Sequence, residues 1–263
     1  MNRQEGYTGK GSLLDRMMRR VAYQWPVSMT NVHVPGGLIT FTFDDFPKSA
    51  AETGAPILED RGLRGTFYVA WGLSGIENHQ GVHCDIADVL ALDAKGHEIA
   101  CHTYGHVDCA HASVEELRRD LDRNARELSA AGLKTPMTSF AYPFGEISVG
   151  AKRLTMQKFT NARGVRDGVN SGRTDMSSLF AAPIETRRPN MLQTAEALIR
   201  RAVDENGWLI FYTHDVCDSP SDFGTTPELL RMIVEAAIAS KAKITTMRDA
   251  ASLVAPTSRE KAA

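Results

Sequence analysis

The chain has 263 residues, and its 30 basic and 32 acidic side chains leave a formal net charge of −2. This balance argues against a nucleic-acid partner, because such proteins usually carry a basic stripe. The chain also lacks a run of about 18 apolar residues, so no transmembrane helix is expected. An apolar signal core is missing from its start as well. We therefore expect a cytoplasmic protein whose four cysteines are free thiols.

Residues 1–36 are predicted to form an approach segment that contains one helix. Apolar residues recur there at helical spacing, with arginines on the other side. A helix that closes the bottom of the domain is favoured over one that lies on a membrane surface or joins two copies. The apolar residues are Leu13, Leu14, Met17, Met18 and Val21, and the arginines are Arg16, Arg19 and Arg20.

From residue 38 onward, strand patterns alternate with helix patterns. A capping box of Ser113 and Glu116 marks the start of the longest helix, and Gly132 marks its end. The stretch 166–194 has little periodicity and is predicted to be a long irregular connection. The predicted strands are 38–43, 65–70, 98–101, 139–142, 159–165, 208–212 and 243–246, with a short one near 179–181. The predicted helices are 51–61, 86–95, 113–131, 149–158, 195–205, 227–240 and 248–254.

Strands that alternate with helices predict a parallel sheet, here built from about seven units. No glycine-rich dinucleotide fingerprint follows any strand, so a closed or nearly closed barrel fits better than an open doubly wound sheet. No linker or repeat is visible. We therefore expect a single α/β domain over residues 37–254, followed by a frayed tail at 255–263.

Polar and aromatic residues follow four of the predicted strands, at 44–45, 102–106, 142–145 and 213–215. In a parallel barrel these strand ends lie on one face, where active sites are built. Because adjacent strand residues point to opposite faces, one of Asp44 and Asp45 can face a metal while the other reaches a substrate or a water. The plainer alternative is an acidic turn before Pro47.

His102 and His106 are four residues apart, so one helical turn would place both imidazoles on the same side. An aspartate from another strand end would complete a two-histidine, one-carboxylate metal site with open positions. A closed zinc site from Cys101, Cys109 and His111 is the competing possibility, although the chain has no CxxC pair. His214 is a candidate proton donor across the pocket, or else a buried, hydrogen-bonded histidine.

Four motifs resemble, in order and approximate spacing, those of the polysaccharide deacetylases, which are carbohydrate esterase family 4. They are TFDDFP (42–47), HTYGH (102–106), AYPFG (141–145) and FYTHD (211–215), and the resemblance covers roughly residues 37–250. It implies a distorted, TIM-like (β/α)7 barrel. It also implies an amidase that uses one divalent metal, foremost Zn²⁺, to remove N-acetyl groups from amino sugars.

The resemblance also implies a role for each motif residue. Asp44 would be the catalytic base, and His214 the general acid. The backbone N–H of Phe144 would help to hold the oxyanion. The implied metal ligands are Asp45, His102 and His106.

Two positions depart from the family pattern. Phe46 stands where the family has glycine, and its ring is expected to narrow the groove in favour of a small or terminal sugar. Ala141 stands where the family has an arginine that steadies the catalytic aspartate. Arg163 and Arg166 are the candidate replacements. The fourth family motif has no clear match, and Asp167 and Asp175 are the candidates for its acid.

Four aromatic residues could offer flat faces to a sugar ring, although each also suits a core or rim position: Trp71, Tyr104, Tyr142 and Tyr212. The sequence thus predicts a metal-dependent deacetylase that hydrolyses the N-acetyl amide of an amino sugar in a polysaccharide, oligosaccharide or glycan precursor. One alternative is a deformylase or another C–N hydrolase that acts on a lipid- or nucleotide-linked sugar. The other is a non-catalytic sugar-binding relative.

Overall fold

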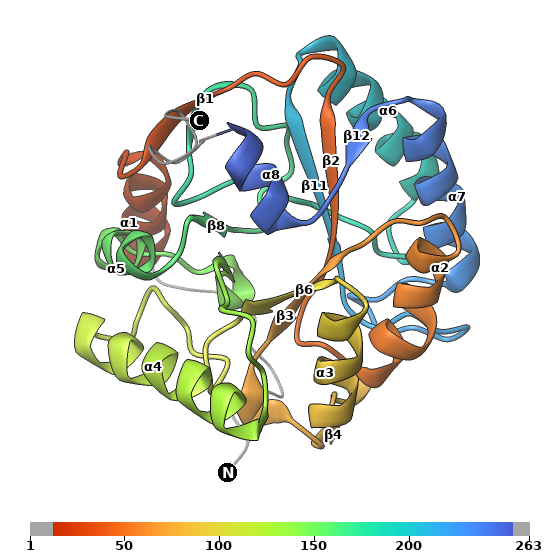
Figure 1. The fold of residues 1–263 in the computed structure, drawn as a ribbon. Helices are drawn as coiled ribbons and strands as arrows, with labels where there is room; N and C mark the ends of the chain where they lie inside the picture. Colours follow the sequence, from red (N-terminus) through yellow and green to blue (C-terminus); the bar gives the residue numbers. More distant parts are fainter. Residues whose placement is uncertain (1–12, 255–263) are drawn as a thin grey trace, which may run out of the picture.

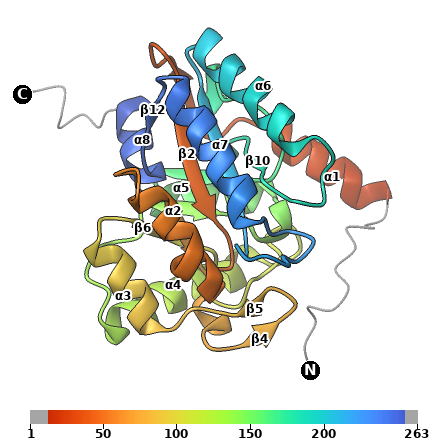
Figure 2. The same cartoon turned by 90° about the vertical axis from the view of Figure 1, so that its right-hand side faces the viewer.

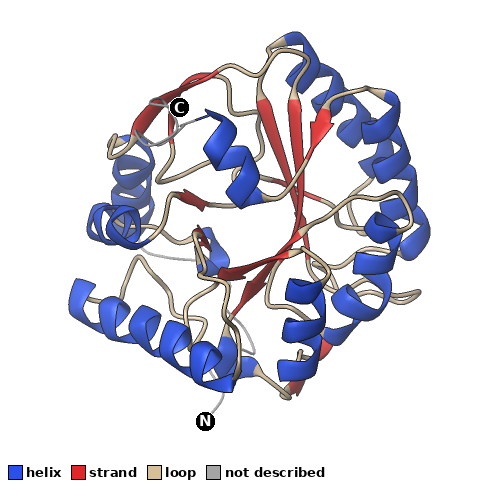
Figure 3. Ribbon diagram, in the orientation of Figure 1, coloured by secondary structure: helices blue, strands red, loops and turns tan. Residues whose placement is uncertain are grey.

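The computed structural model describes residues 13–254, with side chains from residue 17 onward, so the tail expected at 255–263 lies outside the described residues. Parallel strands form one curved sheet, and helices surround it (Figure 1, Figure 3). The strands are β2 (Leu38–Phe43), β3 (Thr66–Val69), β6 (Glu98–Cys101), β7 (Ser139–Ala141), β8 (Asn161–Arg163), β10 (Ala182–Pro183), β11 (Trp208–Thr213) and β12 (Lys243–Ile244).

The strand order along the curve is β10–β11–β2–β3–β6–β7–β8, and β12 pairs with the first residues of β2. An isolated bridge between Arg163 and Leu179 lies where the curve would close between β8 and β10. The predicted parallel, nearly closed α/β barrel is therefore confirmed. All candidate strand ends meet at its carboxyl rim.

The helices outside the sheet bury one apolar stripe each, as amphipathic helices do. Figure 2 shows α7 in front of β2, with α6 and α2 on either side of it. Ser113 and Glu116 form the predicted capping box of α4, which ends at Gly132 with a φ of 124°. The helices are α2 (Ala55–Glu59), α3 (Ile86–Ala94), α4 (Val114–Ala131), α5 (Val149–Lys158), α6 (Met191–Asp204) and α7 (Pro227–Ala239).

Strands β2 and β11 are buried along their whole length, as expected for a parallel sheet that is covered on both faces. Phe41 and Phe43 pack with residues of the surrounding helices, whereas Leu38 belongs to a second cluster with Trp208 and α8 (Met247–Val254). Side chains alternate along a strand. Asp44, which follows Phe43, therefore continues the series that faces the barrel interior.

The N-terminal helix α1 (Leu13–Gln24) does not close the bottom of the barrel as expected. Its Tyr23 hydroxyl donates to the carbonyl of Gly145 at 2.8 Å, in the loop after β7 at the carboxyl rim. The amino-terminal end is closed by α8 instead (Figure 1). There, the backbone N–H of Met247 donates to Thr66 at 2.9 Å and that of Arg248 donates to Glu98 at 2.7 Å.

Several expected element bounds are wrong, and for the strands the reason is that pairing with distant segments decides where each one ends. The strand expected at 159–165 is confined to β8, and the helix expected at 195–205 already begins at Met191. The stretch 166–194 contains β10 and β9 (Gly172–Asp175), which pairs antiparallel with β1 (Met29–Val32). A hairpin of β4 (Glu77–Asn78) and β5 (Gly81–Val82) was not predicted.

No described helix is both long and apolar enough to cross a membrane.

Candidate active site

The acidic turn after β2 has an unusual backbone conformation. Asp45 and Phe46 both have positive φ angles, of 58° and 55°, a region that costs a residue with a Cβ roughly 1–2 kcal/mol. The Phe46 ring is fully buried and lies 5.1 Å from the ring of Phe67, centre to centre. The expectation that Phe46 narrows the groove is therefore wrong. Its ring points into the core, and its burial stabilises the turn.

The segment that follows the β4–β5 hairpin holds this turn in place. The Nδ1 atom of buried His83 lies 3.0 Å from the backbone carbonyl oxygen of Asp45. The backbone N–H of Cys84 donates to the carbonyl of Phe46 at 2.9 Å. These contacts account for the stability of two consecutive left-handed residues, since such strain persists only where the surroundings over-determine it.

Asp45, His102 and His106 gather at the carboxyl rim, with their potential ligand atoms within 4.8 Å of one another. The Nε2 atoms of His102 and His106 lie 3.4 and 3.0 Å from Oδ1 of Asp45. The two histidines are not on a helical turn, as their spacing suggested. They lie on a loop with positive φ at Thr103 and His106. Asp120 of α4 stabilises this loop, because its carboxylate accepts hydrogen bonds from the backbone N–H groups of residues 104 and 105.

The donor set fits a divalent cation. His102 Nδ1 donates to the carbonyl of Ala141 at 2.8 Å, so in the neutral ring the lone pair of Nε2 faces Asp45. Asp45 Oδ1 is buried and has no hydrogen-bond donor. Two acceptors that face each other in a buried site need a cation or a proton between them. Nitrogen and carboxylate oxygen ligands that leave coordination positions open are typical of catalytic zinc.

The charge of Asp45 suits this environment. Burial alone would raise the pKa of its carboxyl, but His106 and His102, in their protonated forms, outweigh burial and hold the pKa well below its usual range. The carboxylate form is therefore the one present at neutral pH.

Gln80, at the tip of the β4–β5 hairpin, contacts the same carboxylate. Its side-chain N–H donates to Asp45 Oδ2 at 3.1 Å, and Gln80 is buried. This bond occupies Oδ2 and turns Oδ1 toward the histidines. No sequence signal indicated Gln80 or His83, because both lie more than 30 residues beyond the motif that they support.

Gln80→Leu is expected to weaken metal binding about 10- to 100-fold, the usual cost of removing a partner that orients a ligand. The variant keeps the size of the side chain but leaves Asp45 free to rotate. Competition with a chromogenic chelator would measure the metal affinity, with Glu77→Ala on the exposed strand of the same hairpin as the control. An unchanged affinity in Gln80→Leu would refute this role.

Asp44 forms a buried ion pair with Arg163, whose guanidinium also donates to Thr42 at 3.2 Å. Burial disfavours the guanidinium charge, but Asp44 outweighs it and raises the pKa of Arg163. Ala141, which stands at the usual arginine position, is the register partner of Arg163 across β7 and β8. The arginine therefore reaches the acid from the neighbouring strand. Arg166 instead lies exposed over the rings of residues 23 and 180.

His214 and Phe144 complete the rim. His214 Nε2 lies 4.0 Å from Asp45 Oδ2, and its Nδ1 lies 3.2 Å from the carbonyl oxygen of Phe223. Phe144 has a φ of 59°, and its ring packs edge-on against His106 at 4.4 Å between ring centres. The turn that carries its backbone N–H thus lies directly beside the predicted ligands.

The expected sugar contacts are contradicted for two of the four aromatic residues. Tyr142 is buried, and its hydroxyl bonds to Thr155 and the carbonyl of Ser177 at 2.9 and 3.0 Å. Tyr212 is also buried, behind the guanidinium of Arg163. Both rings therefore pack in the core and are not available to a sugar. Trp71 and Tyr104 are partly exposed and remain predictions.

Other candidates do not join the cluster. Asp175 accepts from the backbone N–H groups of residues 27 and 28 and pairs with Lys152, so its role is structural. Cys101 and Cys109 are buried free thiols, and among the described residues the Asp45 group is the one set placed to hold a metal. The competing cysteine site is therefore not formed.

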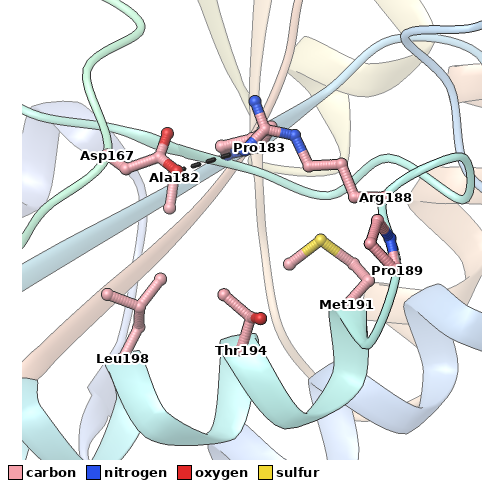
Figure 4. A pocket seen from close by; sticks show the side chains of 8 residues that line it. All are labelled: Asp167, Ala182, Pro183, Arg188, Pro189, Met191, Thr194 and Leu198. Carbon is pink, nitrogen blue, oxygen red and sulfur yellow. Dashed lines mark hydrogen bonds and ion pairs between the residues drawn. The ribbon is translucent and has the colours of Figure 1, made fainter.

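Asp167 lies at a separate pocket of about 340 Å³ beside α6. Figure 4 shows its ion pair with Arg188, at 3.1 Å, above Met191, Thr194 and Leu198. None of the predicted catalytic or metal-binding residues lines this pocket. Asp167 therefore does not support the candidate site.

The model of the polysaccharide deacetylase family matches residues 31–161, which include the first three motifs and the cluster of Asp45, His102 and His106. The chain belongs to the polysaccharide deacetylase family. Over 121 residues the chain is 34% identical to chitin disaccharide deacetylase of Vibrio alginolyticus. This matched segment covers 46% of this chain and 27% of that relative. The matched segment is thus about a quarter of the relative's length.

Solved structures support the (β/α)7 barrel of this chain. The chitin deacetylase of Colletotrichum lindemuthianum has a TM-score of 0.59 at 16% identity, over 86% of this chain and 91% of that one. A CE4 family pseudoenzyme of Bacillus anthracis has a TM-score of 0.55 at 14% identity, over 86% of this chain and 69% of that one. At such identities the likeness establishes the fold alone, so the activity must be argued from the site.

Proposed function

We propose that this polysaccharide deacetylase hydrolyses the N-acetyl amide of an amino sugar in a glycan or glycan precursor. It uses one divalent metal ion for this reaction, and Zn²⁺ is the ion that we expect. The observation that carries the proposal is the buried Oδ1 of Asp45, which faces two histidine nitrogens beside an Asp44 held by Arg163. A ligand set and a candidate base thus stand side by side. The deacetylase named among its relatives supports an amide substrate.

Each step of amide hydrolysis has a candidate residue here. A metal held by Asp45 and the two motif histidines would supply polarisation of the carbonyl and activation of water. Asp44, which Arg163 holds in place through an ion pair, accepts the proton of the attacking water. The backbone N–H of Phe144 stabilises the developing oxyanion.

His214 delivers the proton to the leaving amine, without which the tetrahedral adduct would return to the amide. Its Nδ1 proton is directed to the carbonyl of Phe223, so Nε2 is the atom that gains and gives a proton. This Nε2 faces Asp45 and hence the reacting centre.

The decisive experiment combines metal analysis with a panel of N-acetyl and N-formyl amino sugars. We expect about one divalent ion per chain, release of acetate, and loss of activity on chelation that added metal restores. Asp45→Ala and His102→Ala are expected to lose the metal, whereas His33→Ala, an exposed histidine elsewhere, is expected to keep it.

Formate release without acetate would favour the deformylase alternative. No product from metal-loaded protein across the panel would favour a non-catalytic sugar-binding protein. If Asp45→Ala and His102→Ala bound metal as tightly as the parent protein, the proposed ligand set would be refuted.

A further inference from the structure

Helix α1 exposes large apolar side chains on its outer face. Met17 and Met18 are 66% and 61% exposed, and Val21 and Trp25 are 47% and 49% exposed. At 3.6 residues per turn, these four positions fall within an arc of about 100°. They form one contiguous face, which we call the α1 apolar face.

The opposite side of α1 already packs on the barrel. Ala22 is buried, Tyr23 bonds to Gly145, and Arg19 pairs with Glu146 at 2.7 Å. A surface helix usually turns its polar side to water. This helix instead turns an apolar side outward, and contiguous exposed apolar surface of this kind is typical of an interaction site.

The helix cannot simply roll over to bury this face. The ammonium of fully buried Lys152 donates to the carbonyls of Ala22 and Trp25 at 3.0 and 2.6 Å, at the end of α1. Rotation would break both of these hydrogen bonds and leave the buried ammonium with its ion pair to Asp175 alone, which is costly. The orientation of the α1 apolar face is therefore built into the fold.

Size argues against a second copy as the occupant. From Met17 to Trp25 the face is about 12 Å long, whereas a stable dimer interface uses roughly 20–30 residues from each partner. A single amphipathic helix is, by contrast, sufficient to bind the surface of a bilayer.

Charge favours a lipid surface that is anionic. The helix LLDRMMRRVAYQ has three arginines and one aspartate, within a chain of net charge −2, and one of the arginines, Arg19, is paired with Glu146 on the barrel side. Arg20 is exposed beside the apolar face, and Trp25 lies at its end. Basic residues that flank an apolar face bind anionic lipid, and tryptophan favours the membrane interface.

We propose that the α1 apolar face docks on the surface of an anionic lipid bilayer. Tyr23 of this helix contacts Gly145, in the turn that also carries Phe144 of the candidate site. The helix that carries the docking surface thus packs, through its inner side, on the loop that carries Phe144. If the proposed deacetylase activity holds, on which this last step rests, the substrate class is an amino sugar carried on a lipid.

Co-sedimentation with phosphatidylcholine vesicles, with and without phosphatidylglycerol, tests the surface directly and needs no substrate. We expect the protein to sediment with the anionic vesicles and to dissociate as salt is raised. The triple variant Met17→Ser, Val21→Ser, Trp25→Ser is expected to reduce binding at least about tenfold. Met232→Ser and Ile238→Ser, which are 40% and 37% exposed on α7, form the matched control and should leave binding unchanged.

Failure of the parent protein to sediment with anionic vesicles would overturn the proposal. So would a dimer, seen by light scattering, that the triple variant converts to monomer, because a second copy would then cover the face. Arg20→Glu, which removes no packing, should weaken binding to anionic vesicles even if the triple variant unfolds. If the parent protein does not bind vesicles but is fully active on a soluble sugar, the surface proposal alone is refuted. If the parent protein binds vesicles but is inactive on every sugar, the proposed function alone is refuted.

Discussion

Asp44→Asn is expected to reduce the turnover number roughly 10²- to 10⁴-fold, the range that a positioned general base contributes. The amide has nearly the shape of the carboxylate but cannot accept the proton of the attacking water. Asp44 is not among the three predicted ligands, so the variant should bind metal as the parent protein does. Initial rates of acetate release, with metal content measured on the same samples, would test this result.

Asp218→Asn is a suitable control, because Asp218 is an exposed aspartate in the loop after β11. Its activity should equal that of the parent protein. If Asp44→Asn kept activity within about tenfold, Asp44 would not be the base. Loss of the metal in Asp44→Asn would instead make Asp44 a ligand and would require the roles of Asp44 and Asp45 to be reassigned.

Arg163→Met is expected to lower the free energy of unfolding by about 3–5 kcal/mol, the usual cost of removing one partner of a buried ion pair. Arg163 is fully buried, and Asp44 is almost so. Methionine fills much of the space but leaves the carboxylate of Asp44 without a counter-charge. Denaturant unfolding, followed by circular dichroism, measures this change directly.

The double variant Asp44→Asn, Arg163→Met separates charge from packing. It removes both charges, so we expect it to be more stable than Arg163→Met alone. Arg166→Met should cost about 1 kcal/mol or less, because Arg166 is exposed and stacks only on the rings of Tyr23 and Phe180. Equal losses of stability in the single and double variants would show that Asp44 and Arg163 do not act as a pair.

This pair also explains how the family pattern can change without loss of the site. Ala141 and Arg163 are register partners on adjacent strands. Side chains at such paired positions point to the same face of the sheet. A guanidinium can therefore reach the carboxylate of Asp44 from either strand, so that the missing arginine at position 141 does not leave Asp44 unpartnered in this structure.

The sequence by itself determined the order of the strands and helices that build the barrel and the set of strand ends that meet at one rim. Periodicity, capping residues and the motif spacing are local properties, and a parallel barrel brings the carboxyl ends of its strands together whatever their exact bounds. Asp45, His102 and His106 could therefore be grouped, and Arg163 could be singled out with one rival.

Only the tertiary structure decided which way individual side chains turn and what supports them. Phe46 points into the core, Tyr142 and Tyr212 are buried, and Gln80 reaches Asp45 from a hairpin 35 residues further on. Position and packing against distant elements set these features, and local patterns do not encode them. The same reason applies to α1, whose amphipathic sequence shows an apolar side, whereas only its packing on the barrel, which includes the contacts of Lys152, shows that this side faces outward.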